Sequence, residues 1–138
     1  MRNLVLSALI ILGTATTAAA VAQGADQAQV MSETVAQPRM VEVDLSNFAF
    51  GPKTIQLQGG VPIVLKLVNT ASGGHNFSAP QLFAAARGVS GPVRRGAVEV
   101  PGHQSVDIRL TPARGSYRLR CTHTLHTAFG MTGTITVE

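Results

Sequence analysis

Hydrophobic and polar residues alternate along most of the chain from residue 40 onward, with the period of two that indicates β-strands. In residues 41–46, Val and Leu alternate with acidic residues and Ser, and Phe residues at positions 48 and 50 continue the pattern. Turns that contain Gly or Pro separate this segment from those that follow. Strands are therefore expected at residues 41–46, 48–50, 55–58, 61–68, 97–100, 106–110, 117–121 and 132–137.

One central segment, residues 80–87, has a different pattern. It has Pro near its start, Ala in its body and Gly88 after its end, and these start and stop signals predict a short helix. Short strands separated by Gly and Pro turns, with one small helix in the central connection, are typical of an all-β sandwich.

The N-terminal segment reads as a targeting signal. An apolar run follows Arg2 and ends in small residues up to Ala22, which predicts a secretory signal peptide over 1–22. An uncleaved membrane anchor is the alternative, and the shortness of the apolar run disfavours it. Residues 23–39 are expected to be a flexible lead-in and residues 40–138 a single domain, located in the periplasm or otherwise exported, with no membrane span after cleavage.

Charge and cysteine content narrow the choice of partners. The 138 residues carry 11 Lys and Arg against 7 Asp and Glu, a net charge of +4. The arginines are scattered, without a basic tract or interleaved aromatic residues, so we expect a solvated basic face suited to an acidic partner and not a nucleic-acid site.

The single cysteine, Cys121, cannot form an intramolecular disulfide, and it is either a buried inert thiol or a metal ligand.

The C-terminal stretch contains three soft or intermediate metal ligands in the pattern C-x4-H-x4-M. Cys121, His126 and Met131 lie on one loop between two expected strands, so the loop can wrap around a metal. Thiolate, imidazole and thioether together suit copper better than magnesium, calcium or manganese. The best candidate for a fourth ligand is His75, which follows the strand ending near residue 68. Two His, one Cys and a weak axial Met form the blue-copper electron-transfer arrangement.

Each of these residues also has a simpler interpretation. His75 alone is more easily read as a hydrogen-bonded loop histidine, Met131 as core and Cys121 as a buried thiol, and only their joint spacing favours copper. His123 lies two residues from Cys121, too close to share the metal comfortably, and we expect it beside the site or at the surface. His103 lies on an expected turn and should be solvated.

The chain resembles the cupredoxin family, which includes plastocyanin, azurin and rusticyanin, over residues 41–138. The resemblance rests on Phe48-x-Phe50-x-Pro52, Gly74-His75-Asn76, Gly115-Ser-Tyr117-Arg-Leu-Arg-Cys121, the C-x4-H-x4-M spacing, and Gly130-Met131-x-Gly133-x-Ile135-x-Val137. It implies a Greek-key β-sandwich that holds one Cu(I)/Cu(II) per chain. It also implies that the Gly74 carbonyl approaches the copper and that Asn76 hydrogen-bonds across to the Thr122 segment. The ligand loop departs from the family in lacking the Pro often found between Cys and the second His, and in its extra His123.

The expected function is that of a monomeric one-electron carrier that docks a redox partner near His126. Phe77 and Phe129 are candidates for the apolar surroundings of the copper. The alternative is a periplasmic copper carrier or copper-stress protein without an electron-transfer role. An enzyme is not expected, because there is no catalytic constellation. Cys121 also lacks the flanking histidines that multicopper oxidases place beside their cysteine, having Arg120 and Thr122 instead.

Overall fold

The structure is a computed structural model, and it describes residues 37–124 and 129–138. Its elements follow the chain as β1 (Arg39–Ser46), β2 (Ala49–Gly51), β3 (Thr54–Leu57), β4 (Ile63–Asn69), β5 (His75–Ser78), α1 (Pro80–Ala85), β6 (Arg87–Ser90), β7 (Ala97–Val100), β8 (Ser105–Thr111), β9 (Gly115–Arg120) and β10 (Thr132–Val137). The signal peptide predicted at 1–22 lies outside the described residues, as does nearly all of the lead-in.

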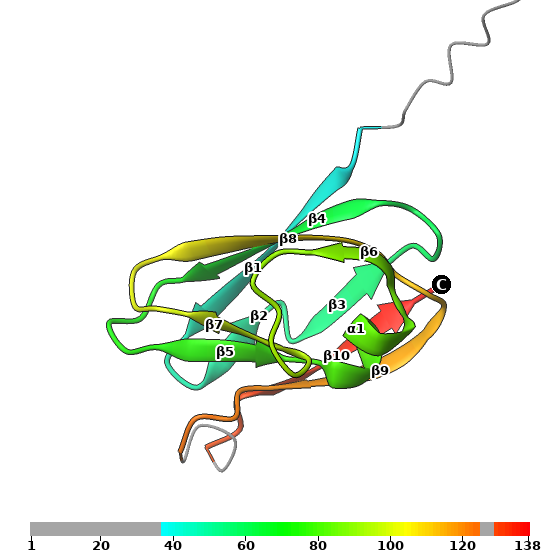
Figure 1. Cartoon of the computed structure of the whole chain (residues 1–138). Helices are drawn as coiled ribbons and strands as arrows, with labels where there is room; N and C mark the ends of the chain where they lie inside the picture. The colour runs from blue at the N-terminus through cyan, green and yellow to red at the C-terminus, as the bar shows by residue number, and fades with distance from the viewer. Residues whose placement is uncertain (1–36, 125–128) are drawn as a thin grey trace, which may run out of the picture. The chain divides into compact units, whose positions relative to one another are not determined.

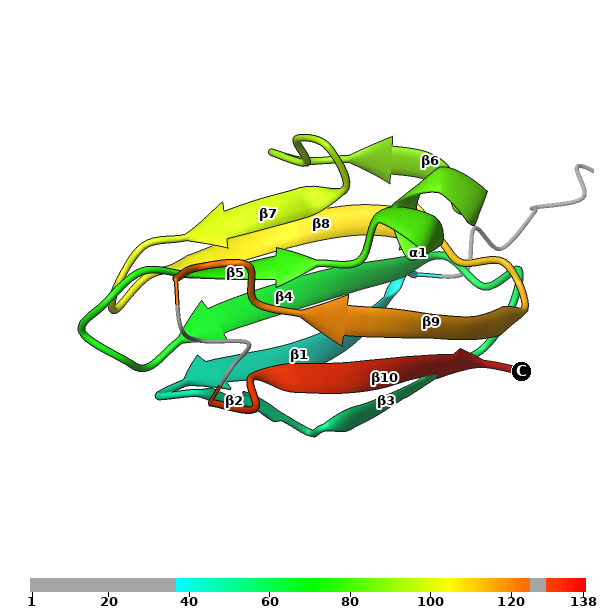
Figure 2. The same ribbon diagram turned by 90° about the horizontal axis from the view of Figure 1, so that it is seen from below.

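The strands form two five-stranded sheets that pack face to face (Figures 1 and 2). The first sheet has the order β2-β1-β4-β8-β6 and the second β3-β10-β9-β5-β7. β1 pairs with β4, and β3 with β10, in parallel, whereas the other pairs are antiparallel. The expected all-β sandwich with one short helix in its central connection is confirmed.

Alternation along the strands sets which side chains enter the core. In β1, Val43 and Leu45 are fully buried while the acidic residues between them are exposed. The parallel register places Val43 beside Leu67 of β4, so both strands present hydrophobic side chains to the same interior. Phe77 of β5 is also fully buried, and its ring meets that of Phe50 edge-on with centroids 6.1 Å apart. The candidate copper neighbour Phe77 is thus part of the main core.

Two strands, β5 and β6, were not predicted from the sequence pattern. β5 is buried at all four positions despite containing His, Asn and Ser, so it shows no alternation. β6 is exposed at all four positions and pairs with β8 at the edge of the first sheet. The helix expected at 80–87 ends at Ala85, because Arg87 already pairs with Thr111 of β8.

The loops after β4, β7 and β9 and the β1–β2 turn lie at the same end of the sandwich (Figures 1 and 2). This end carries His75, at the start of β5, and Cys121, just after β9. In residues 37–124 and 129–138, no helix has the length and hydrophobicity needed to span a bilayer.

Candidate metal centre

Cys121 and Met131 are joined at the two ends of the ligand loop. Cys121 follows the last residue of β9, and its backbone N–H donates to the Met131 carbonyl over 3.0 Å. This bond extends the β9–β10 ladder by one step beyond the pairing of Thr132 with Arg120. Both side chains are fully buried. The ladder therefore closes the loop and holds a thiol and a thioether in the interior.

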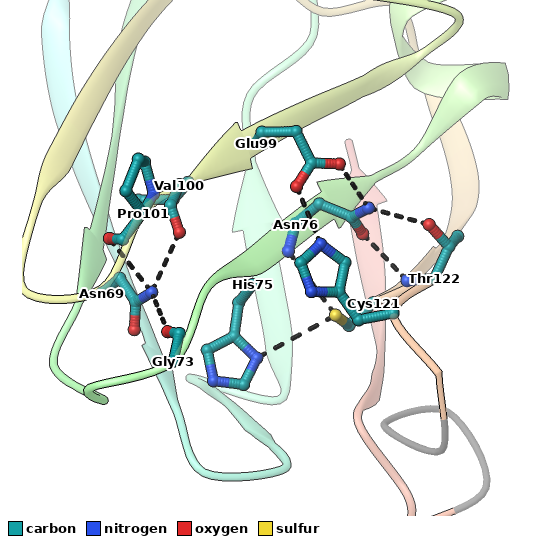
Figure 3. Close-up of polar contacts among 10 residues, drawn as sticks. Asn69, Gly73, His75, Asn76, Glu99, Val100, Pro101, Cys121 and Thr122 are labelled. Carbon is teal, nitrogen blue, oxygen red and sulfur yellow. Dashed lines mark hydrogen bonds and ion pairs between the residues drawn. The ribbon is translucent and has the colours of Figure 1, made fainter.

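His75 approaches the thiol from the neighbouring strand. It is the first residue of β5 and only 2% exposed, and its Nδ1 atom lies 3.9 Å from the Cys121 Sγ atom (Figure 3). Nitrogen and sulfur ligands at about 2.0 and 2.3 Å from a tetrahedral metal such as zinc lie roughly 3.5 Å apart. The spacing of these two atoms thus fits two ligands of one ion. His75 is 46 residues from Cys121 in sequence, and the sheet brings them together.

The structure describes only some of the other residues that the sequence singled out near the metal. His126, near which a redox partner is expected to dock, lies outside the described residues. Phe129 is 64% exposed and its ring centroid lies 5.2 Å from that of Phe48, so it belongs to the surface and not to the core. His103 is exposed on the β7–β8 turn, as expected.

The Asn76 amide clamps the start of the ligand loop. Its Oδ1 atom accepts a 2.8 Å hydrogen bond from the Thr122 N–H, and its Nδ2 group donates over 2.8 Å to the Thr122 hydroxyl (Figure 3). The Asn76 backbone N–H points at the Cys121 Sγ atom over 3.5 Å. The expectation that Asn76 bonds across to the Thr122 segment is confirmed. Asn76 therefore contacts the start of the loop with its side chain and the Cys121 sulfur with its backbone.

Glu99 of β7 is a residue that the sequence did not single out. One of its carboxylate oxygens accepts from the Asn76 Nδ2 group over 2.8 Å, and the other lies 2.8 Å from the His123 Nε2 atom. Partial burial works to raise the pKa of Glu99, but the hydrogen bonds from Asn76 and His123 outweigh it and hold the pKa below the ordinary value of 4.5. The carboxylate is therefore ionised at neutral pH and able to accept from both neighbours.

Asn69 is a second residue that sequence reasoning missed. It ends β4 and is 2% exposed, and its Nδ2 group donates to the carbonyls of Gly73 and Val100 over 2.9 Å each and of Pro101 over 3.2 Å. Its Oδ1 atom accepts from the Ala71 N–H. This side chain ties the loop before His75 to the end of β7. The available signal was a polar residue at the end of an unusually hydrophobic strand.

The donor chemistry of the described residues fits copper. Cys121, His75 and Met131 offer thiol, imidazole and thioether groups, which are soft or intermediate ligands. Within the described ranges, His, Cys, Asp and Glu form no cluster of three or more, so no site made only of such residues competes there. The Gly74 carbonyl contact with copper stays a prediction. His123 has its Nε2 atom directed at Glu99.

The fold and sequence match known copper proteins. A family model described as copper binding proteins of the plastocyanin/azurin family matches residues 38–138. A reduced auracyanin from Roseiflexus castenholzii is 26% identical with a TM-score of 0.56, covering 72% of this chain and 96% of that one. Auracyanin A, a "blue" copper protein from Chloroflexus aurantiacus, is 18% identical with a TM-score of 0.55, covering 74% and 100%.

A more distant likeness involves a multicopper oxidase from Aquifex aeolicus, at 15% identity and a TM-score of 0.59, covering 75% of this chain and 30% of that one. At that identity the likeness shows the fold alone. Among curated protein sequences, none matches the chain significantly.

The family model covers nearly the whole of the described domain, and it agrees with the two-sheet sandwich and with the buried thiol, imidazole and thioether at one of its ends. The chain belongs to the plastocyanin/azurin family of copper-binding proteins, a cupredoxin whose cofactor is one copper ion per chain.

Proposed function

We propose that the chain is an exported type 1 copper protein that carries single electrons between redox partners, with copper held by His75, Cys121, His126 and Met131. The observation that carries the ligand set is the 3.9 Å approach of the His75 Nδ1 atom to the buried Cys121 Sγ atom. Copper in such a set of donors changes between Cu(I) and Cu(II) by one electron.

An electron carrier works best when its ligands move little between oxidation states. The described ligands are held in this way, because His75 lies in a strand paired on one side with β7 and Cys121 is bonded at its backbone to Met131. Asn76 adds side-chain bonds between these two segments. Rigid ligand positions thus support electron transfer over a role in binding and releasing copper.

Burial of the proposed ligands supports this function over that of a copper carrier. Cys121 and Met131 are fully buried and His75 nearly so, whereas rapid handover of copper needs ligands that an incoming protein can reach. The proposal places the docking site of a redox partner near His126, with the exposed Phe129 beside it, and it includes no catalytic reaction.

The test is the optical spectrum of the Cu(II)-loaded protein. We expect one copper per chain with an intense visible band, because the thiolate donates charge to Cu(II), and we expect Cys121→Ser to lose that band while its far-ultraviolet circular dichroism stays that of a β-protein. His103→Asn serves as the matched control, since His103 is an exposed turn histidine outside the proposed set.

Two outcomes bear against the proposal in different ways. A visible band retained in Cys121→Ser would refute the thiolate ligand. A wild-type protein that shows the band but surrenders copper to a chelator faster than it exchanges electrons with a small redox reagent would favour the copper-carrier function.

A further inference from the structure

The first residues of the ligand loop need contacts to hold them, because the segment from Cys121 to Met131 contains no proline to stiffen it. Thr122 is held by the Asn76 amide. The side chain of His123, the additional histidine of the loop, contacts Glu99 on β7.

Glu99 uses both carboxylate oxygens in this arrangement. Its Oε1 atom accepts from the Asn76 Nδ2 group and its Oε2 atom from the His123 Nε2 group, each over 2.8 Å. A carboxylate only accepts hydrogen bonds, so the Nε2 atom of His123 carries the proton in this contact. One side chain thereby joins the second residue of β5 to the third residue of the ligand segment.

The sheet relates this bridge to His75. Glu99 is the cross-strand partner of Asn76, and the next residue, Val100, is the partner of His75. The position of Glu99 relative to His75 is therefore set by the β5–β7 ladder. Because Glu99 also contacts His123, the β5–β7 ladder also fixes the position of the loop two residues beyond Cys121.

We propose that Glu99 is a positioning residue for the copper ligands, which fastens the loop through His123 and orients the Asn76 amide so that Cys121 and His75 keep their spacing. This inference rests on the proposed function, because it assigns the bridge a purpose at the copper site. An exposed contact of this kind contributes little to stability by itself, so we expect loss of Glu99 to change the geometry of the copper site more than the melting temperature.

The experiment compares Glu99→Ala, Glu99→Gln, His123→Ala and the double variant Glu99→Ala/His123→Ala in the full chain. The control is Glu42→Ala, which removes an exposed carboxylate that bridges to Lys66 in the other sheet. In the copper-loaded proteins the readouts are the visible and electron paramagnetic resonance spectra and the rate of copper loss to a chelator.

We expect Glu99→Ala and His123→Ala each to alter the copper spectra and to speed copper loss by about tenfold, as loss of a residue that orients metal ligands does. The double variant should be no worse than Glu99→Ala, because His123 acts through its contact with Glu99. Glu99→Gln keeps a carbonyl oxygen that accepts from the Asn76 Nδ2 group, and its NH2 group can donate to the His123 Nε2 atom when the imidazole takes its other neutral tautomer, so it should restore spectra close to those of the wild type. Glu42→Ala should leave every readout unchanged.

A second readout uses the metal-free protein, so that the two proposals can fail separately. Amide hydrogen exchange at Thr122, whose N–H donates to Asn76, should be faster in Glu99→Ala and unchanged in Glu42→Ala. Absence of the visible band in the wild type would defeat the proposed function alone. The positioning role would be overturned if Glu99→Ala had the spectra, the rate of copper loss and the Thr122 exchange rate of the wild type. It would also be overturned if Glu99→Gln failed to restore these properties.

Discussion

At the scale of single residues, the site depends on side chains that each satisfy several partners at once. The Asn76 amide is fixed in one orientation, because its oxygen must face the Thr122 N–H while its nitrogen faces both the Thr122 hydroxyl and Glu99. In the described part of the chain, no buried side-chain nitrogen or oxygen lacks a hydrogen-bond partner. Polar side chains inside the described sandwich are therefore tolerated, because each of their buried nitrogen and oxygen atoms has at least one hydrogen-bond partner.

Met131 allows a test of the axial position. Its side chain is fully buried, and Leu has a similar volume, so Met131→Leu should fold with little loss of stability. Removing a weak donor from Cu(II) favours Cu(I), so the variant should keep copper and its colour while its reduction potential rises, as measured by voltammetry.

The outcome at this position discriminates between two roles for Met131. Loss of copper from Met131→Leu would show that the thioether is required for binding and is not a weak axial ligand. If Met131 is only a core residue and not a copper ligand, Met131→Leu should leave the reduction potential unchanged.

At the scale of elements, the loops around the site are tied to strands by backbone contacts. The Asn69 N–H donates to the Gln104 carbonyl over 2.8 Å, in addition to the bonds of its side chain. The β4–β5 and β7–β8 connections also approach closely, since a Cβ atom on Gly102 would overlap the Ser72 carbonyl oxygen. The loop that delivers His75 is thus packed against the end of β7.

Asn69→Ala should loosen this pair of connections. It removes the donor for three carbonyls and the acceptor for the Ala71 N–H, at a site closed to solvent. Leaving buried groups unpaired costs about 1–3 kcal/mol. We expect a loss of this size in the free energy of unfolding of the metal-free protein, measured by urea titration.

Asn47→Ala is the matched control, because Asn47 is exposed at the β1–β2 turn and should change stability little. An Asn69→Ala variant with the same urea midpoint as the wild type would contradict the role assigned to Asn69.

At the scale of the whole molecule, one end of the sandwich carries the buried His75, Cys121 and Met131 and also exposed aromatic side chains. Phe48 from the β1–β2 turn and Phe129 from the ligand segment are both exposed and in ring contact there. Exposed apolar side chains rimmed by polar surface suit transient docking. The net charge of +4 favours approach of an acidic partner.

Export is a prediction about the whole chain. If residues 1–22 are a cleaved signal peptide, mass spectrometry of the protein from its native host should find an N-terminus near Gln23. Recovery of the chain from the membrane fraction with Met1 retained would favour the membrane-anchor alternative.

The sequence alone was sufficient for the fold class and for most strands. Alternation within β1, β3 and β8 is a local property, since it reflects which face of a strand meets the core. The same holds for Cys121 and Met131, because their spacing along one loop already indicates soft ligands that suit copper. The match to the plastocyanin/azurin family confirms that interpretation of the cofactor.

Only the tertiary structure decided which distant residues support the site. The pairing of β5 with β7 and β9 brings His75 to Cys121, and the same ladder places Glu99 beside Asn76. These contacts join strands 23 to 46 residues apart, and their register depends on the packing of both sheets and not on any local pattern. β5 itself was not recognised, because a strand buried on both faces loses the alternation that marks a strand in sequence.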